Sequence, residues 1–391
     1  MKSMTDLDLA GKNVLVRVDF NVPIDEAGNI TDDIRMRMVL PTLEYILKQG
    51  AKLILCTHRG RPKGKRVEAF SLTPLVPHLE KLLGRSVTLA PDCVGDEVES
   101  LVQSVSPETV ILLENLRFHE GETANDPGFS EQLARLAEVY INDAFAVSHR
   151  AHGSVTGVAA QVAEKGAGFL LQKEMDYFAK AMTNPVRPLA AIIGGAKVSS
   201  KITALQNMLD TVDKVIIGGA MANTFLSSQG VAMGASMIEE EYLDVAREFI
   251  ESAERKGVRI YLPIDFVVAD SFSELAVTKN VTFRDIPDSW MALDIGPATT
   301  TYFGEALADA KTIIWNGPMG VFEKDPLARG TMALCHTVAA SHALSITGGG
   351  DSNAAVKKAG EEKNIGYMST GGGAFLMLME GKVLPGVAIL E

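Results

Sequence analysis

The sequence predicts an α/β protein with two doubly wound, parallel-sheet (Rossmann-like) domains joined by a hinge helix. The chain has 391 residues, more than one domain usually holds. In both halves, short apolar runs alternate with longer amphipathic runs, which is typical of βαβ units around a buried parallel sheet. Residues 168–183 carry apolar side chains at helical spacing and end before Asn184-Pro185. We therefore expect the connecting helix there.

The elements of the first half follow from this alternation. We expect strands and helices at these positions: strands 13–22, 52–57, 87–90, 109–115 and 139–145; helices 40–49, 72–84, 96–105 and 129–137. Each strand is short and rich in Val, Ile and Leu, as strands buried on both faces are.

The second half repeats the pattern and adds a glycine signature. Strands are expected at 188–195, 214–219, 259–268, 312–318, 343–350 and 365–373. Four of them end in glycines: Gly194-Gly195, Gly218-Gly219, Gly348-Gly349-Gly350 and Gly371-Gly372-Gly373. Glycine lets the backbone approach an anion where helix N-termini present free N–H groups. One glycine pair is equally explained by a tight turn, but four in one domain favour an anion site.

Composition and charge exclude several classes of protein. The formal charge is −12, which argues against a nucleic-acid surface. The apolar runs are too short to span a bilayer. Three separated cysteines form neither a metal motif nor a disulfide framework, and the first residues do not resemble a signal peptide. We expect a cytoplasmic monomer that acts on small molecules, without a nucleic-acid or membrane partner.

Polar side chains follow successive strands of the first half, and Arg35 stands in a loop that can join them. These residues are Arg17, Asp19, Asn21, His58, Arg61, Arg117 and Arg150. A single arginine is more often a solvated surface residue, but convergence at one sheet edge favours a site. Guanidinium forks suit a small, multiply charged phosphorylated acid. His58 can serve as a general base or as a hydrogen-bond donor to an anion.

The second half offers lysines and a carboxylate beside its glycines. Lys197 and Lys201 lie one helical turn apart after Gly194-Gly195, so both can face one phosphate group. Asp351 and Ser352 follow three glycines; they can be a plain helix cap or hold a Mg²⁺-nucleotide. The chain has neither GxxxxGK[ST] nor GxGxxG. The residues thus point to phosphoryl transfer between a nucleotide and a small phosphorylated acid.

Nine motifs make a family resemblance visible. They are RVDFNVP, HRGRP, LLENLRFH, DAFAVSHRAH, GGAKVSSKI, LPIDFVVA, WNGPMGVFE, GGGDS and STGGGAF, in this order. Together they resemble bacterial phosphoglycerate kinases nearly end to end. The resemblance implies a phosphoglycerate-binding domain (1–168), an interdomain helix (169–183) and a nucleotide-binding domain (184–379), with the tail (380–391) packing back on the first. It also implies reversible phosphoryl transfer, with Mg²⁺, between ATP and the carboxylate of 3-phosphoglycerate.

The resemblance also implies site residues, carried over motif by motif. The acid would be bound by Asp19, Phe20, Asn21, Arg35, His58, Arg59, Gly60, Arg61, Arg117 and Arg150. The nucleotide would be bound by Gly195, Lys197, Lys201, Gly219, Gly296, Asn316, Glu323, Gly349, Gly350, Asp351 and Ser352, with Asp351 on the metal. The catalytic groups would be Arg35, Lys197, Gly350 and Gly372.

Four positions depart from the family pattern, which usually has leucine, threonine, serine and glutamate there. They are Arg59, Ser352, Phe375 and Met377. None removes an expected phosphate ligand.

Two other classes share the architecture, an NAD-dependent dehydrogenase and a hinge-closing anion-binding protein. The missing GxGxxG disfavours the first, and the lysine and glycine cluster of the second half disfavours the other.

Overall fold

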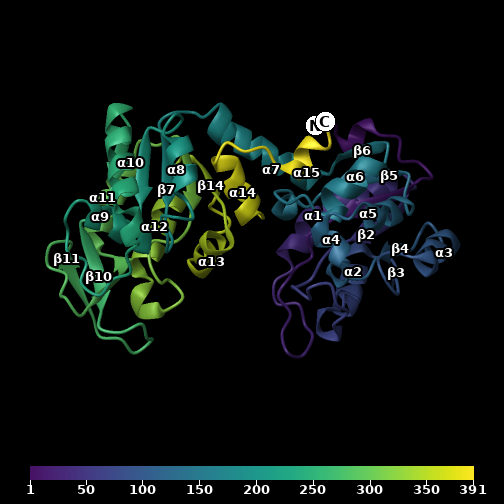
Figure 1. Cartoon of the computed structure of the whole chain (residues 1–391), viewed down its shortest axis with the longest axis horizontal. Coiled ribbons are helices and arrows are strands. Elements are labelled where there is room, and N and C mark those ends of the chain that lie inside the picture. The colour runs from purple at the N-terminus through teal and green to yellow at the C-terminus, as the bar shows by residue number, and fades with distance from the viewer. The chain divides into compact units, whose positions relative to one another are not determined.

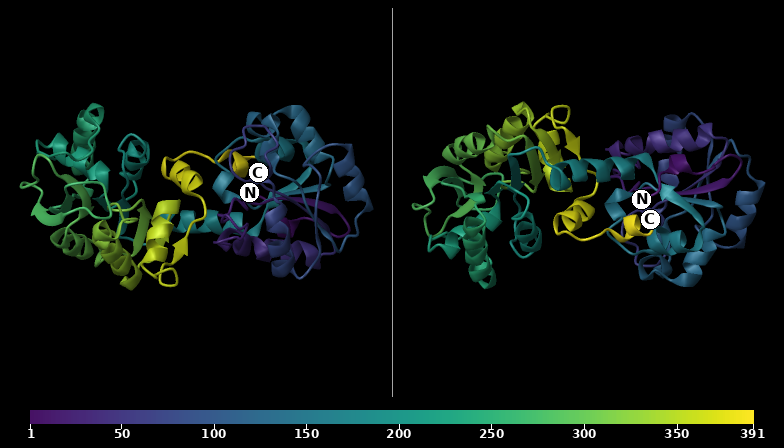
Figure 2. Two further views of the ribbon diagram at one scale, coloured as in Figure 1. Left: turned by 90° about the horizontal axis from the view of Figure 1, so that it is seen from below. Right: turned by 90° about the horizontal axis from the view of Figure 1, so that it is seen from above.

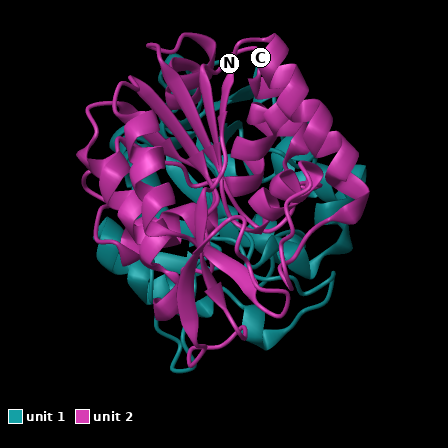
Figure 3. Cartoon of the chain, turned by 90° about the vertical axis from the view of Figure 1, so that its left-hand side faces the viewer, with its two compact units in different colours: residues 1–175, 383–391 teal, residues 176–382 magenta.

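The computed structural model describes residues 1–391 as two compact units (Figure 3). Unit 1 comprises Met1–Met175 and Val383–Glu391, and unit 2 comprises Asp176–Lys382. The division falls inside helix α7 (Phe169–Phe178), which continues as one π-helical segment over Ala179–Thr183. The structure contains no helix that is both long enough and apolar enough to cross a membrane.

Unit 1 is built around a six-stranded sheet in the order β3-β4-β2-β1-β5-β6. Its strands are β1 (Asn13–Arg17), β2 (Lys52–Cys56), β3 (Val87–Leu89), β4 (Val110–Leu112), β5 (Val139–Asn142) and β6 (Glu164–Ala167). All neighbours pair in parallel. The chain moves outward from β1 to β2 on one side and from β5 to β6 on the other. Ligands in such sheets bind beyond the carboxyl ends near this switch in direction.

Helices cover this sheet, and their ends follow local sequence signals (Figure 1). They include α1 (Ile34–Lys48), α2 (Val76–Leu83), α3 (Asp96–Ser104), α4 (Glu120–Ala124), α5 (Pro127–Ala134) and α6 (Val158–Gln161). Asp126 caps α5 by accepting from the Phe129 amide, with Pro127 at the first helical position. Gly84 ends α2 with a φ of 62°, a left-handed conformation that glycine adopts without strain.

Unit 2 contains a second six-stranded parallel sheet, in the order β15-β14-β13-β7-β8-β9. Its strands are β7 (Leu189–Ile193), β8 (Lys214–Ile217), β9 (Arg259–Tyr261), β13 (Thr312–Asn316), β14 (Leu344–Thr347) and β15 (Tyr367–Met368). Its helices are α8 (Ile202–Met208), α9 (Ala220–Ser228), α10 (Leu243–Arg255), α11 (Pro297–Leu307), α12 (Arg329–Ala340), α13 (Gly350–Lys358) and α14 (Gly372–Met379). Two parallel α/β sheets confirm the predicted fold class.

Unit 2 also has a small antiparallel sheet that the sequence reasoning did not predict. It consists of β10 (Asp265–Ala269), β11 (Thr278–Thr282) and β12 (Met291–Ile295) in the order β11-β10-β12. The prediction of one strand over 259–268 was therefore wrong. The segment forms β9 and then β10 in a different sheet. Pro263 lies between them, and proline cannot donate a backbone hydrogen bond to a ladder.

The two ends of the chain lie side by side in unit 1 (Figure 2). The Lys2 amide donates to the Leu390 carbonyl at 3.1 Å. The last helix, α15 (Pro385–Ala388), is fastened by Gly386, whose amide donates to Ser148 and whose carbonyl accepts from Asn142 Nδ2 at 2.9 Å. The tail is therefore an integral part of unit 1.

Candidate functional site

Most of the predicted polar residues of unit 1 lie beyond the carboxyl ends of its parallel strands; Arg17 is the last residue of β1 and is buried. Asp19 and Asn21 follow β1, His58 and Arg61 follow β2, and Arg150 follows β5. Arg117 follows β4 within a short 3-10 turn. Arg35 stands in the first turn of α1, so its placement in a loop was wrong; the helix begins at Ile34 instead of residue 40. Strand ends of a parallel sheet meet at one edge, so the topology gathers these side chains.

Hydrogen bonds tie the segments of this edge together. Arg35 Nη1 donates to Asp19 Oδ2 at 2.6 Å. Asn21 Oδ1 accepts from the Gly60 amide at 3.0 Å, and Arg117 Nη1 donates to the Gly60 carbonyl at 2.7 Å. Gly60 has a φ of 64°, and a Cβ there would lie 2.4 Å from the Phe70 ring. Glycine is therefore required where three loops meet.

A cavity of about 580 Å³ opens at this edge. Its lining includes Arg61, Lys63, Arg117, Arg150 and His152. Arg61 is exposed, whereas burial and the charges of Arg150 and Arg17 lower the pKa of Arg117 to about 10. Cations held this close repel one another and favour a multiply charged anion among them.

A buried chain of hydrogen bonds supports the cluster from beneath. Arg17 is fully buried, and its Nε donates to Ser154 Oγ at 2.8 Å. Ser154 in turn donates from its Oγ and its amide to the carboxylate of Glu122, both at 2.8 Å. Burial alone would raise the pKa of Glu122, but hydrogen bonds from His152 and Ser154 and the charge of Arg17 lower it. Glu122 thus stays anionic and balances the buried guanidinium.

The same chain of hydrogen bonds, through Arg17, also fixes the tautomer of His58. Arg17 Nη2 lies 3.2 Å from His58 Nδ1. A guanidinium can only donate, so Nδ1 must accept and the ring proton resides on Nε2. Burial and the charges of Arg17, Arg117, Arg150 and Arg35 place the pKa of His58 well below 6.5. His58 is therefore a neutral donor, which resolves the choice that the sequence left open.

Two predicted acid-site residues have other contacts. Phe20 is fully buried in the hydrophobic core beside Val18 and Val22, and its amide donates to Thr57 Oγ1 at 2.9 Å while its carbonyl accepts from the Val22 amide at 2.8 Å. Arg59 Nη1 donates to the Ser71 carbonyl at 2.9 Å. The extra charge at position 59 thus joins the loop to residue 71 and does not line the cavity.

The glycine turns of unit 2 meet at the carboxyl edge of its main sheet. A Cβ on Gly219 would lie 2.5 Å from the backbone of Gly195, and one on Gly194 would lie 2.1 Å from the Pro318 carbonyl. A Cβ on Gly372 would lie 3.0 Å from the Cα of Gly349. The strand ends of β7, β8, β13 and β14 are therefore packed backbone to backbone, and side chains there would prevent it.

Lys201 lies within this edge. It is largely buried, and its Nζ donates to the carbonyls of Gly194 at 2.6 Å and Asn316 at 3.0 Å. Burial lowers the pKa of Lys201 to about 8, against the opposing charge of Asp351. Lys197 and Asp351 are both exposed. Asp351 stands in the first turn of α13, whose N-terminus begins at Gly350, so a carboxylate, free amides and two lysines occur together.

Asn316 and Ser352 hold the turns in shape. Asn316 Nδ2 donates to the Gly348 carbonyl at 2.7 Å. Ser352 Oγ accepts from the Gly317 amide at 2.6 Å and donates to Gly348 at 3.0 Å. Serine therefore supplies the hydroxyl that threonine usually provides. The departure at Phe375 is explained by packing, because a Cβ on Gly348 would lie 2.2 Å from its ring; nothing in the structure explains Met377.

Two predicted nucleotide residues belong to a neighbouring segment. Gly296 precedes α11, where a Cβ would lie 2.3 Å from the Asp265 carboxylate. Glu323 is exposed in the loop between β13 and α12. That loop pairs with β12 through the Val321 amide and the Leu293 carbonyl at 2.9 Å. It therefore connects the glycine turns to the small antiparallel sheet.

Sequence reasoning missed Glu122 and Ser154. Neither follows a strand directly, since Glu122 lies in α4 and Ser154 in a π-helical turn over Gly153–Gly157. The only available signal was a carboxylate on a short helix after LRFH. That signal is too weak to separate a buried residue from a solvated one.

The fold and the two edges are those of an α/β protein of the phosphotransferase class, with arginines at the edge of one unit and glycine turns with lysines at the edge of the other. The phosphoglycerate kinase family model matches residues 4–382. A phosphoglycerate kinase of Desulfotalea psychrophila is 65% identical over 391 residues, covering 100% of both chains. One from Citrifermentans bemidjiense is 55% identical over 384 residues, covering 98% of this chain and 96% of the relative. The chain belongs to the phosphoglycerate kinase family.

Solved structures agree with this assignment. The phosphoglycerate kinase of Coxiella burnetii superposes with a TM-score of 0.89 at 41% identity, covering 99% of this chain and 98% of the other. That of Pyrococcus horikoshii gives a TM-score of 0.87 at 30% identity, covering 100% and 98%. The architecture of both units is therefore that of the family.

Proposed function

We propose that this chain transfers a phosphoryl group reversibly between ATP and the carboxylate of 3-phosphoglycerate, giving ADP and 1,3-bisphosphoglycerate, a step of glycolysis. The observation that carries the proposal is the pair of edges: arginines in unit 1 and glycine turns with lysines in unit 2. Membership of the family supports it. An NAD-dependent dehydrogenase and a binding protein without catalysis are not favoured.

In unit 1, Arg61, Arg117 and Arg150 would hold the phosphate of the acid. His58 would donate from Nε2 to one of its oxygens. Arg35 would have a different role from these residues. Its ion pair with Asp19 orients the guanidinium, and about a third of the Arg35 side chain, 34%, remains exposed. It would stabilise the phosphoryl group as it moves.

In unit 2, the amides of Gly349, Gly350 and Gly372 would surround the nucleotide phosphates. Lys201 would remain at the base of this edge, and the exposed Lys197 would reach the transferring phosphoryl group. The exposed carboxylate of Asp351 fits Mg²⁺, which takes one or two carboxylates together with phosphate oxygens. When bound, the metal would neutralise charge on the phosphates.

No general base or nucleophile is needed. The attacking carboxylate is ionised at neutral pH because carboxyl pKa values lie near 4. The transition state spreads charge over three equatorial oxygens, so aimed cations and N–H donors stabilise it. We infer that turnover requires the two units to approach each other, because the acid and the nucleotide must meet and water must be excluded.

A coupled assay of ADP formed from 3-phosphoglycerate and MgATP tests the activity. Lys197→Ala should lower kcat about 10²–10³-fold, the usual loss for a donor to the transition state, with little change in the KM for the acid. Lys311→Ala is the matched control, because Lys311 is exposed before the amino end of β13, at the opposite edge of the same sheet. Near-normal turnover of Lys197→Ala would refute its role.

Arg61→Ala tests the placement of the acid. It removes an exposed cation from the cavity lining, so the KM for 3-phosphoglycerate should rise about tenfold or more while kcat changes less. Arg85→Ala, an exposed arginine before β3, should leave KM unchanged. An unchanged KM in Arg61→Ala would show that the acid binds elsewhere.

A further inference from the structure

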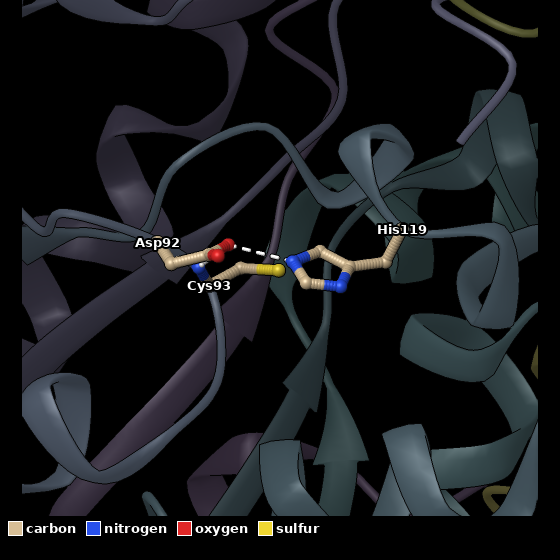
Figure 4. A group of neighbouring side chains, drawn as sticks. All are labelled: Asp92, Cys93 and His119. Carbon is tan, nitrogen blue, oxygen red and sulfur yellow. Dashed lines mark hydrogen bonds and ion pairs between the residues drawn. The ribbon is translucent and has the colours of Figure 1, made fainter. Parts of the chain in front are cut away.

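Three potential metal ligands converge in unit 1 outside the arginine cluster. Asp92 and Cys93 follow β3, and His119 follows the turn after β4. One donor atom from each residue lies within 4.8 Å of the other two. Figure 4 shows the Cys93 sulfur directed toward the edge of the His119 ring that the Asp92 carboxylate contacts. We propose that these three residues form a binding site for a thiophilic divalent cation of the zinc class.

The chemistry of the donors selects the ion. A thiolate, an imidazole and a carboxylate together suit Zn²⁺, whereas Mg²⁺ prefers oxygen ligands alone. Two anionic ligands around a divalent ion give a neutral assembly. Neutrality suits this site because the Cys93 side chain is completely buried. Three protein ligands leave the fourth tetrahedral position to water.

The carboxylate and the imidazole already lie near the separation that a shared ion requires. His119 Nε2 lies 2.7 Å from Asp92 Oδ1. Two donors about 2.0 Å from one tetrahedral ion stand about 3.3 Å apart, so this pair would open by about 0.6 Å. The side chains of Asp92 and His119 are 38% and 33% exposed. Two of the three ligands are therefore partly accessible from solvent, whereas the Cys93 sulfur is buried.

The two acidic side chains of the cluster differ in their electrostatic surroundings. Burial would raise the pKa of the Asp92 carboxyl, but hydrogen bonds from His119 and the Cys93 amide lower it, so this ligand is anionic. Burial and Asp92 raise the pKa of the Cys93 thiol well above 9.0. The thiol is thus neutral until an ion displaces its proton. Two other charges act here: Arg66 on Asp92, and Glu122 on Cys93.

A nucleophilic Cys-His-Asp triad is the other arrangement of these residues, and the structure disfavours it. In a triad the cysteine and the carboxylate contact opposite nitrogens of the imidazole. Here both face one edge of the ring (Figure 4). A reactive cysteine also needs exposure and a lowered pKa, and Cys93 has neither.

Cobalt substitution tests the proposal on the intact chain. We expect chelator-treated protein, without nucleotide, to bind one Co²⁺ with tetrahedral bands in the visible range and a thiolate-to-cobalt band in the near ultraviolet. Zn²⁺ should abolish both. Cobalt bound through Asp351 has only oxygen ligands, so it gives no sulfur band. Absence of the sulfur band in the wild type overturns the proposal.

Variants assign the band to the three residues. Cys93→Ser should remove the sulfur band, and His119→Asn, at a partly exposed position, should weaken Co²⁺ binding about tenfold or more. Cys335→Ser is the matched control, because Cys335 is an equally buried cysteine in unit 2. It should keep the full spectrum. A band that survives in Cys93→Ser, or normal affinity in His119→Asn, also overturns the proposal.

Discussion

Replacing Glu122 by glutamine should destabilise unit 1 strongly. The substitution keeps the size of the side chain but leaves the fully buried guanidinium of Arg17 without its counter-charge. It also weakens two hydrogen bonds from Ser154, each at 2.8 Å. Arg17 and Glu122 are linked through Ser154 rather than paired directly, and removing one partner of a directly paired buried charge costs about 3–5 kcal/mol. Glutamine retains one acceptor oxygen, so we expect a loss near the lower end, about 3 kcal/mol.

The loss should be visible in one unit only. For a domain of this size, about 3 kcal/mol corresponds to a fall of about 6–12 °C in the unfolding midpoint. Both tryptophans, Trp290 and Trp315, lie in unit 2. Tryptophan fluorescence therefore follows unit 2, and hydrogen exchange of peptides from β1 and β5 follows unit 1. We expect weaker protection of those peptides with little change in fluorescence.

An exposed pair provides the control. Glu131 and Arg135 form an i,i+4 pair at 3.0 Å with side chains 59% and 54% exposed, so Glu131→Gln should cost less than about 0.5 kcal/mol. A loss below about 1 kcal/mol in Glu122→Gln would refute the reasoning. The pKa of Glu122 is lowered below 4.5, so its contribution is present above that pH and disappears under more acidic conditions. The variant should therefore lose less stability in acid than the wild type.

Three further predictions follow from the same geometry. If His58 is neutral with its proton on Nε2, its nitrogen chemical shifts in the free enzyme should report that tautomer and show no titration near pH 6.5; a His58 ring that titrates near 6.5 would contradict this. Burial raises the pKa of Asp143 to about 7 from 3.8, so the native state binds the extra proton and stability falls as pH rises between these values. Asp143→Asn should flatten this slope in unfolding midpoints at pH 5 and 8, and an unchanged slope would argue against it. Asp351→Asn should raise the Mg²⁺ concentration needed for half-maximal activity, and an unaltered titration would place the metal elsewhere.

Regular features of the sequence predicted most of the fold. Period and length located the parallel strands except β6, whose polar residues Glu164 and Lys165 hide it, and the glycines after β7, β8 and β14 marked the edge where their backbones meet. The antiparallel sheet escaped prediction because the apolar run over 259–268 looks continuous, although Pro263 divides it. The choice between sheets depends on tertiary pairing, which a local window does not contain.

The candidate site, like the fold, could be predicted from the sequence only in part. Ligands placed directly after strands, such as His58 and Arg117, were predictable because strand ends share one edge. Arg59 could not be interpreted, since only the fold shows that it reaches the Ser71 carbonyl. Glu122 is a similar case, because its burial and its link to Arg17 through Ser154 depend on three distant segments.

Because unit 1 contains residues from both ends of the chain, its last segment is synthesised after the whole of unit 2. Residues 1–175 are made first, yet α15 and the Leu390 carbonyl that accepts from Lys2 are made last. At about 5–20 residues per second, the stretch from residue 176 to residue 391 takes on the order of 10–40 s. Unit 2 is continuous in sequence, so all of its residues precede 383–391, whereas the contacts of α15 with unit 1 form only after residues 383–391 have been made.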